Sequence, residues 1–254
     1  MRQLVAAAAA LGIALDASQQ RRFRQFFELL DQSGRQVNLT GARGWNRVRD
    51  ELIVRSLGFL AGDHLASKDG VHSAVIDVGS GAGVPGIVLK LVHPGLELTL
   101  LDSSAKKTEF LASAVDALEL DGVDVVKARA EEAARDPAFR ERYHCVLARG
   151  LAALPELAEL TLPFARQGGV VLALKPDSAT QELASAAYAA EILGAAPGCI
   201  LDASAGGRHP KDRLVVWRKI APTPQRFPRR AGVPHRRPIV QPGPRLRPAA
   251  TVAT

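Results

Sequence analysis

The stretch Ala74-Val-Ile-Asp-Val-Gly-Ser-Gly-Ala-Gly-Val-Pro-Gly86 decides the fold class of this chain. A short apolar run leads into a loop with glycine at positions 79, 81 and 83, and a helical pattern starts at Gly86. Glycine is needed where the backbone takes a positive φ angle and passes close to a ligand that faces helix N–H groups. The stretch therefore predicts a buried strand, a ligand-binding loop and a helix, with Gly79, Gly81 and Gly83 against the ligand.

Two ligands fit the glycine spacing. Gly81-x-Gly83-x-x-Gly86 matches the dinucleotide fingerprint, while Gly79-x-Gly81-x-Gly83 after Asp77 is typical of the loop in S-adenosylmethionine enzymes. The dinucleotide match starts later than the end of the strand requires, so we favour S-adenosylmethionine as the cofactor. A glycine loop that only makes a turn is the alternative without a ligand.

Short β-type runs alternate with helical patterns from Ser73 onward. The predicted strands are Ala74–Val78, Leu96–Leu101, Val123–Ala128, His144–Ala148, Gly169–Leu174, Cys199–Ala203 and Arg213–Arg218. The predicted helices between them are Gly86–Val92, Ser104–Leu120, Ala130–Ala134, Leu154–Ala165 and Ser178–Leu193. This alternation predicts a doubly wound α/β fold with a mostly parallel sheet. No helix separates the last two strands, so we expect them to form an antiparallel hairpin at one edge.

Further candidate residues follow the other strands. Asp102 comes 23 residues after Gly79, close to the ~20 expected for an acid on ribose hydroxyls, although it could equally cap the next helix. Ala130 and Glu131 follow the third strand, where adenine would need contacts; Glu131 could also be an ordinary acid of a first helical turn. Arg149 ends the fourth strand and predicts either a charged group in the ligand crevice or a buried ion pair.

The chain divides into three parts by pattern. Residues 1–65 read as an N-terminal helical subdomain, with a capped second helix starting near Asp16 and loop signals at Ser33-Gly34 and Gly41–Gly44. Residues 66–221 form the cofactor-binding domain. Residues 222–254 hold eight of the sixteen prolines and read as a basic tail, extended or disordered.

Positive charge is concentrated near the C-terminus. Residues 208–247 carry twelve Lys and Arg and one acid, whereas the rest of the chain carries 21 Lys and Arg and 25 acids. Such a patch favours a polyanionic partner, nucleic acid above all, over a tail that only aids solubility. We expect five arginines to contact RNA phosphates without affecting the cofactor site: Arg226, Arg229, Arg230, Arg236 and Arg237.

Composition excludes several classes of protein. The chain has 254 residues and only two cysteines, Cys145 and Cys199, which excludes a disulfide scaffold and a cysteine zinc cluster. The six histidines lack metal-ligand spacing, and no apolar run is long enough to span a membrane. Met1–Leu15 is rich in alanine and predicts a helix better than a signal peptide. We therefore expect a cytoplasmic protein, a monomer, with no metal and no membrane partner.

Several motifs together resemble the GidB/RsmG family, cytoplasmic bacterial methyltransferases that modify guanine N7 in 16S ribosomal RNA. They are Asn38-Leu39-Thr40, Asp77–Gly86, Leu101-Asp102-Ser103-x-x-Lys106-Lys107, Ala148-Arg149, Ala173-Leu174-Lys175 and Arg226–Pro238. The similarity runs from about Leu4 to Ile239 and implies a seven-stranded class I methyltransferase sheet. It also implies an S-adenosylmethionine pocket with Gly79, Val84, Ala130, Glu131 and Arg149, and the small ribosomal subunit as partner.

One segment departs from the family. Its members usually carry Arg-His-x-x-Asp-Ser in the N-terminal helices, where this chain has Glu51-Leu52-Ile53-Val54-Arg55-Ser56. The missing His and Asp motivate a second hypothesis, a non-catalytic RNA- or ribosome-binding protein that kept the fold. A nicotinamide-dependent oxidoreductase ranks third, because its sheet is usually all parallel. The resemblance assigns no role to the residues after Ile239.

Overall fold

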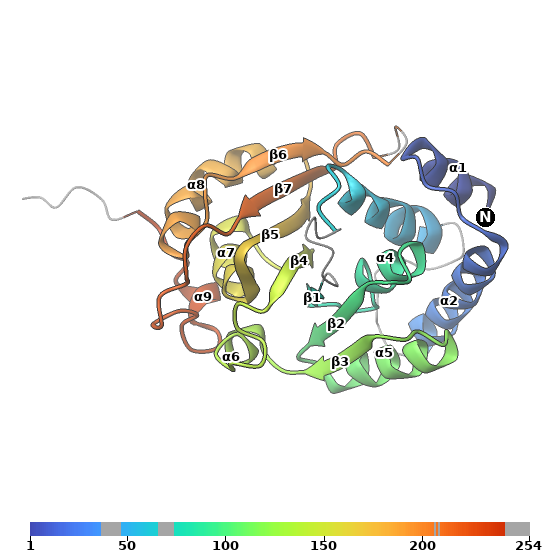
Figure 1. Ribbon diagram of the computed structural model, residues 1–254, viewed down its shortest axis with the longest axis horizontal. Coiled ribbons are helices and arrows are strands. Elements are labelled where there is room, and N and C mark those ends of the chain that lie inside the picture. Colours follow the sequence, from blue (N-terminus) through green and yellow to red (C-terminus); the bar gives the residue numbers. More distant parts are fainter. Residues whose placement is uncertain (37–46, 66–73, 206, 208, 242–254) are drawn as a thin grey trace, which may run out of the picture.

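The structure, a computed structural model, describes residues 1–36, 47–65, 74–205, 207 and 209–241. Within these residues seven strands form one sheet, with helices on both of its faces (Figure 1). The strands are β1 Ala74–Val78, β2 Glu97–Asp102, β3 Val123–Lys127, β4 Tyr143–Arg149, β5 Ala165–Lys175, β6 Cys199–Asp202 and β7 Arg213–Arg218. All seven predicted strands are confirmed, with bounds that differ by a few residues.

The strand order is β3-β2-β1-β4-β5-β7-β6. The order runs toward one edge of the sheet from β1 to β3 and toward the other edge from β4 onward, so the topological switch point, here called the turning point, lies between β1 and β4. The first five strands are parallel, whereas β7 runs antiparallel to β5 and to β6. The predicted antiparallel edge is confirmed, with β7 inserted between β5 and β6. In such open sheets ligands bind beyond the carboxyl ends of the strands at the turning point.

The helices cover both faces of the sheet. Their bounds are α1 Arg2–Ala10, α2 Ala17–Gln36, η1 Val48–Val54, η2 Leu57–Leu60, α4 Gly86–Val92, α5 Ala105–Ala117, α6 Ala130–Ala133, α7 Leu154–Thr161, η3 Leu162–Phe164, α8 Ala179–Ile192 and α9 Val233–Arg236. The helix predicted to reach Ala165 instead ends at Thr161, because Pro163 cannot continue a helical hydrogen-bond ladder. The freed residues allow β5 to begin at Ala165 rather than Gly169.

Two apolar clusters form the core, one on each face of the sheet. Val75 and Leu147 belong to the first cluster, while Ile76 and Val146 belong to the second. The assignment alternates because successive side chains of a strand point to opposite faces.

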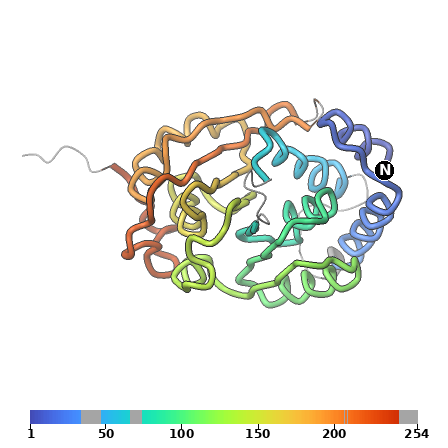
Figure 2. The backbone as a smooth tube through the Cα atoms, in the orientation of Figure 1, coloured from blue at the N-terminus to red at the C-terminus, as the bar shows by residue number. Residues whose placement is uncertain are grey.

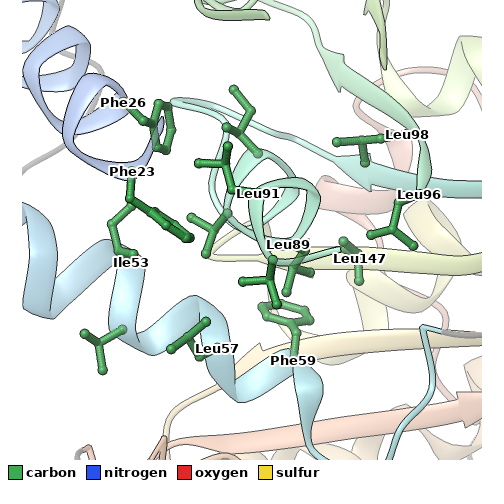
Figure 3. Close-up of a cluster of buried hydrophobic side chains, with 14 of the residues drawn as sticks. Phe23, Phe26, Ile53, Leu57, Phe59, Leu89, Leu91, Leu96, Leu98 and Leu147 are labelled. Atoms are coloured by element: carbon green, nitrogen blue, oxygen red, sulfur yellow. The ribbon is translucent and has the colours of Figure 1, made fainter. Parts of the chain in front are cut away.

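The N-terminal helices belong to the first cluster and pack on α4. Phe23 and Phe26 of α2 and Phe59 of η2 lie around this helix, which contributes Leu89 and Leu91 (Figure 3). N-terminal helices and sheet therefore share one apolar cluster.

The start of α2 follows the predicted capping pattern, but its end does not. Asp16 and Gln19 exchange hydrogen bonds from backbone N–H to side-chain oxygen at 2.7 and 2.9 Å, a reciprocal cap. The loop predicted at Ser33-Gly34 is wrong, since α2 continues to Gln36. One glycine costs a helix only about 1 kcal/mol, which packing of the aromatic face outweighs. Asn38–Thr40 and Gly41–Gly44 lie outside the described residues.

Residues 222–241 fold back onto the second face of the sheet, so the prediction of an extended or disordered tail is wrong for them. Proline-rich backbone has few N–H groups, and here its carbonyls accept hydrogen bonds from arginine side chains. Arg140 donates to the carbonyls of Thr223 and Phe227 at 2.7 and 2.8 Å, and Phe227 is buried in the second cluster. This segment and the N-terminal helices lie at opposite ends of the molecule (Figure 2).

None of the helices within the described ranges is long and apolar enough to cross a membrane.

Candidate active site

The glycine loop begins where β1 ends and is tied to the neighbouring strand. The N–H of Gly79 donates to the carbonyl of Leu101 at 2.8 Å. Gly79 has a φ of +74°, and a Cβ there would lie 2.7 Å from Leu151 Cδ1. Glycine is therefore favoured at this position by its positive φ angle, and a larger residue would also have to displace the tip of the Leu151 side chain.

Asp102 holds the glycine loop against β2. Its two carboxylate oxygens accept from the N–H groups of Gly81 and Ser104, both at 2.9 Å, and Lys107 Nζ lies 3.7 Å away. A carboxylate has about four acceptor positions, so two remain for a ligand. The residue preceding α5 is Ser104, so Asp102 stabilises the start of that helix from two residues upstream.

Asp77 lies beneath the same loop and is buried. Its Oδ2 accepts from the N–H of Gly86 at 2.9 Å. Burial raises the pKa of the Asp77 carboxyl to about 7, although the Gly86 N–H and the charge of Arg149 act in the opposite direction. Asp77 thus braces the loop and the start of α4 from inside the protein.

A cavity of about 430 Å³ opens beyond the ends of β1, β2, β3 and β4. Its lining residues are Val78, Gly79, Leu101, Asp102, Ser103, Lys107, Ala128, Arg129, Ala130, Glu131, Gly150, Leu151, Glu156, Leu160, Gly232 and His235. The volume lies within the range of about 300–1,000 Å³ that small-molecule sites occupy. The cavity combines glycine backbone, a carboxylate with spare acceptor positions and apolar side chains such as Val78 and Leu151, and this combination suits a nucleoside cofactor.

Four of the predicted cofactor residues line this cavity: Gly79, Asp102, Ala130 and Glu131. Gly81, Gly83, Val84 and Arg149 are not among the lining residues. Gly81 instead donates its N–H to Asp102, and a Cβ at Gly83 would meet Ile87 Cδ1 at 2.5 Å, so that glycine permits the packing of α4.

Comparison with known proteins identifies the chain. The sequence model of the GidB family, rRNA small subunit methyltransferase G, matches residues 19–209. The chain is 38% identical to the Ribosomal RNA small subunit methyltransferase G of Pelotomaculum thermopropionicum over 90% of this chain and 94% of that protein. It is 40% identical to the protein of that name from Rubrobacter xylanophilus, over 84% of this chain and 81% of that one. The chain belongs to the GidB family. It is an S-adenosylmethionine-dependent methyltransferase.

Solved structures agree on the fold. A mutant of MtNAS in complex with S-adenosylmethionine superimposes with a TM-score of 0.52, at 14% identity over 80% of this chain and 76% of that chain. The S-adenosylmethionine-dependent methyltransferase SibL superimposes with a TM-score of 0.51, at 18% identity over 66% of this chain and 55% of that chain. The predicted class I methyltransferase fold is confirmed.

Arg149 contacts Glu51–Ser56, the segment in which the sequence is expected to depart from the family pattern. The guanidinium donates to the carbonyl of Leu52 at 2.7 Å, to Ser56 Oγ at 3.0 Å and to the carbonyl of Glu51. Burial lowers the pKa of Arg149 to about 10, and the charge of Arg55 acts in the same direction. The guanidinium is therefore a partly buried cation that donates to neutral oxygens, and three of its five N–H groups are used.

Arg55, in the same segment, forms an ion pair of its own. Both of its hydrogen bonds to the buried Asp212 carboxylate measure 2.7 Å. His209 Nε2 lies 2.9 Å from the carbonyl of Asp50. Two contacts thus hold η1 and the residue that follows it to the loop between β6 and β7, and so fix this helix beside Arg149.

Four cavity residues from α7 and the C-terminal segment were not predicted from the sequence: Glu156, Leu160, Gly232 and His235. One signal could have found two of them, because Gly232 and His235 lie in Arg226–Pro238, one of the stretches on which the resemblance to the GidB family is based.

Proposed function

We propose that this protein transfers the methyl group of S-adenosylmethionine to N7 of a guanine in 16S ribosomal RNA. The observation that carries the proposal is the cavity beyond β1 and β2, where the glycine loop and Asp102 lie together in a GidB-family chain. Asp102 binds the ribose hydroxyls with its remaining acceptor positions. Ala130 and Glu131 contact the adenine, and the backbone at Gly79 lies against the rest of the cofactor.

The chemistry requires little from the side chains. Bound S-adenosylmethionine supplies an electrophilic methyl group, and guanine N7 attacks with a lone pair that carries no proton. No general base is needed, so catalysis rests on alignment of the reacting atoms and exclusion of water. Cys145 takes no part, because complete burial raises the pKa of its thiol and keeps it protonated.

Arg149 binds the carboxylate of the cofactor's methionine in this proposal. Its present hydrogen bonds go to two carbonyls and a hydroxyl, none of which neutralises the charge. A partly buried guanidinium gains from an anionic partner, because charge-assisted hydrogen bonds are stronger than those to neutral oxygens and strengthen as water is excluded.

Four exposed arginines of the C-terminal segment contact RNA phosphates: Arg226, Arg230, Arg236 and Arg237. They lie on the segment whose Gly232 and His235 line the cavity, which supports an RNA path beside the cofactor. The fifth predicted arginine, Arg229, pairs with Glu159 and supports the segment. We assign the protein to the cytoplasm, where ribosomes assemble, and propose that it acts as a monomer.

The test is incubation of the purified protein with labelled S-adenosylmethionine and unmodified small ribosomal subunits. We expect label in 7-methylguanosine after nuclease digestion of the 16S RNA. Gly81→Val is the matched loss variant, because Gly81 has a φ of +57° that a β-branched residue does not adopt without strain. RNA binding without transfer would favour the non-catalytic hypothesis, and binding of NADH but not S-adenosylmethionine would overturn the cofactor assignment.

A further inference from the structure

Three glutamates of α6 and α7 bind the C-terminal segment, residues 222–241. The Arg229 guanidinium donates to both carboxylate oxygens of Glu159, with Nε at 2.9 and 3.1 Å from them. The backbone N–H of Arg229 also donates to Glu159, at 2.7 Å. Glu131 accepts from the N–H of Gly232 at 2.8 Å, and Glu156 lies 3.2 Å from His235 Nδ1. The side chain of Glu159 has no solvent exposure, so its charge depends on Arg229 for compensation.

The part of the segment that these glutamates bind forms a wall of the cofactor cavity. Gly232 and His235 line the cavity on the same side as Glu131 and Glu156, the two glutamates that hold them. Gly232 has a φ of +76°, which turns the chain there and aims its N–H at Glu131. The cavity is therefore complete only while this part of the segment stays docked.

The same segment also carries exposed positive charge. Arg230, Arg236 and Arg237 are exposed, and Arg226 is exposed with its guanidinium 5.1 Å from the centre of the Phe227 ring. A short stretch of chain thus carries both a part of the cavity wall and a group of exposed arginines.

We propose that residues 226–237 are a latch on the cofactor cavity, which Arg229 closes through Glu159 and which RNA holds closed through the exposed arginines. The inference rests on the proposed function for its RNA-contacting arginines. Cofactor and RNA both favour the docked state, so each raises the affinity for the other by the same factor. The expectation from the sequence, that the arginines act independently of the cofactor site, is replaced by coupling.

The size of the effect follows from the docked fraction. The apparent affinity for a ligand scales with the fraction of molecules in the binding-competent state. Arg229→Gln removes the charge that holds the segment on the buried carboxylate, and if about one molecule in ten stays docked the cofactor binds about tenfold more weakly. Arg230→Gln is the matched control, since it removes the same charge from the next residue but touches neither glutamate nor cavity.

The first measurement is calorimetric titration with S-adenosylhomocysteine in the absence of RNA. We expect about tenfold weaker binding for Arg229→Gln and a change below about twofold for Arg230→Gln. The double variant Glu159→Gln/Arg229→Gln leaves no unpaired buried carboxylate, and we expect it to melt close to wild type while binding as weakly as Arg229→Gln. Wild-type affinity in both Arg229→Gln and the folded double variant overturns the latch.

The second measurement repeats the titration with 16S ribosomal RNA present. We expect RNA to tighten binding to Arg229→Gln at least about fivefold, because only about one molecule in ten of this variant is docked without RNA, and to change the affinity of the already docked wild type by less than about twofold. The Arg226/Arg229/Arg230/Arg236/Arg237→Gln variant also lacks the exposed arginines, and its affinity should not respond to RNA. An Arg229→Gln affinity that does not respond to RNA overturns the coupling. Methyl transfer to 16S RNA by the wild type is assayed separately: transfer without these responses refutes the latch alone, and the absence of both refutes the proposed function as well.

Discussion

Replacing Asp77 by Asn should change how stability depends on pH. Burial raises the pKa of this carboxyl from 3.8 in the unfolded chain to about 7 in the folded protein. The folded protein therefore binds the proton more tightly, so the contribution of Asp77 to stability is complete below about pH 4 and is lost as pH rises through 7. A shift of about three units corresponds to about 4 kcal/mol. Asn cannot ionise, yet it keeps an oxygen for the Gly86 N–H.

The measurement is urea unfolding of wild type and Asp77→Asn at intervals from pH 4 to pH 8. The free energy of unfolding of Asp77→Asn should rise relative to wild type across this range, approaching about 4 kcal/mol at the upper end. Asp124→Asn removes an exposed carboxyl from the edge strand β3 and controls for the loss of one acid. A difference between Asp77→Asn and wild type that stays constant with pH would refute the argument, because a group with equal pKa in both states contributes no pH dependence.

Three further outcomes are expected. Gly86→Ala should lower the free energy of unfolding, measured in urea, by about 1–3 kcal/mol, because the new Cβ would lie 2.5 Å from Leu100 Cδ2 and 2.9 Å from Asp77 Oδ2. Unchanged stability would show that these two neighbours move freely. Arg149→Gln should weaken cofactor binding, measured by calorimetry, by about 1.5–3 kcal/mol, because a charge-assisted hydrogen bond is removed. A lower melting temperature with unchanged cofactor affinity would show that Arg149 only holds η1 in place. The Arg226/Arg230/Arg236/Arg237→Gln variant should flatten the salt dependence of RNA binding, by about 0.7–0.9 in the log–log slope for each phosphate that is no longer neutralised, and an unaltered slope would exclude phosphate binding by these arginines.

The first strand and the helix after the glycine loop could be predicted from short-range sequence signals. The strand at Ala74–Val78 and the helix at Gly86–Val92 have the predicted bounds, because hydrophobic period and glycine spacing act over a few residues. Asp102 was found in the same way, since the residue that ends a parallel strand next to the turning point reaches the crevice whatever surrounds it.

Predictions failed where packing overrode a local signal. Gly34 signals a loop, yet α2 continues through it. The prolines from Pro222 onward signal extended chain, yet the Arg140 side chain donates to the carbonyls of Thr223 and Phe227, and the Phe227 ring packs in the core. Both failures have one cause, which is that tertiary packing outweighs a local signal. One glycine costs a helix about 1 kcal/mol, whereas burial of one large apolar side chain stabilises the fold by about 1.5–3 kcal/mol.

The sequence by itself determined the sheet, the glycine loop, the family and the cofactor. Only the tertiary structure decided the walls of the cavity and the partners of its charges. Glu131 and Gly232 are 101 positions apart, and Glu159 and Arg229 are 70 apart, so no local period connects them. A glutamate in a first helical turn and an arginine in a proline-rich tail each satisfy several environments equally well. Their pairing follows from where the sheet brings α6, α7 and the C-terminal segment together, because a buried carboxylate is stable only beside the cation that the fold delivers to it.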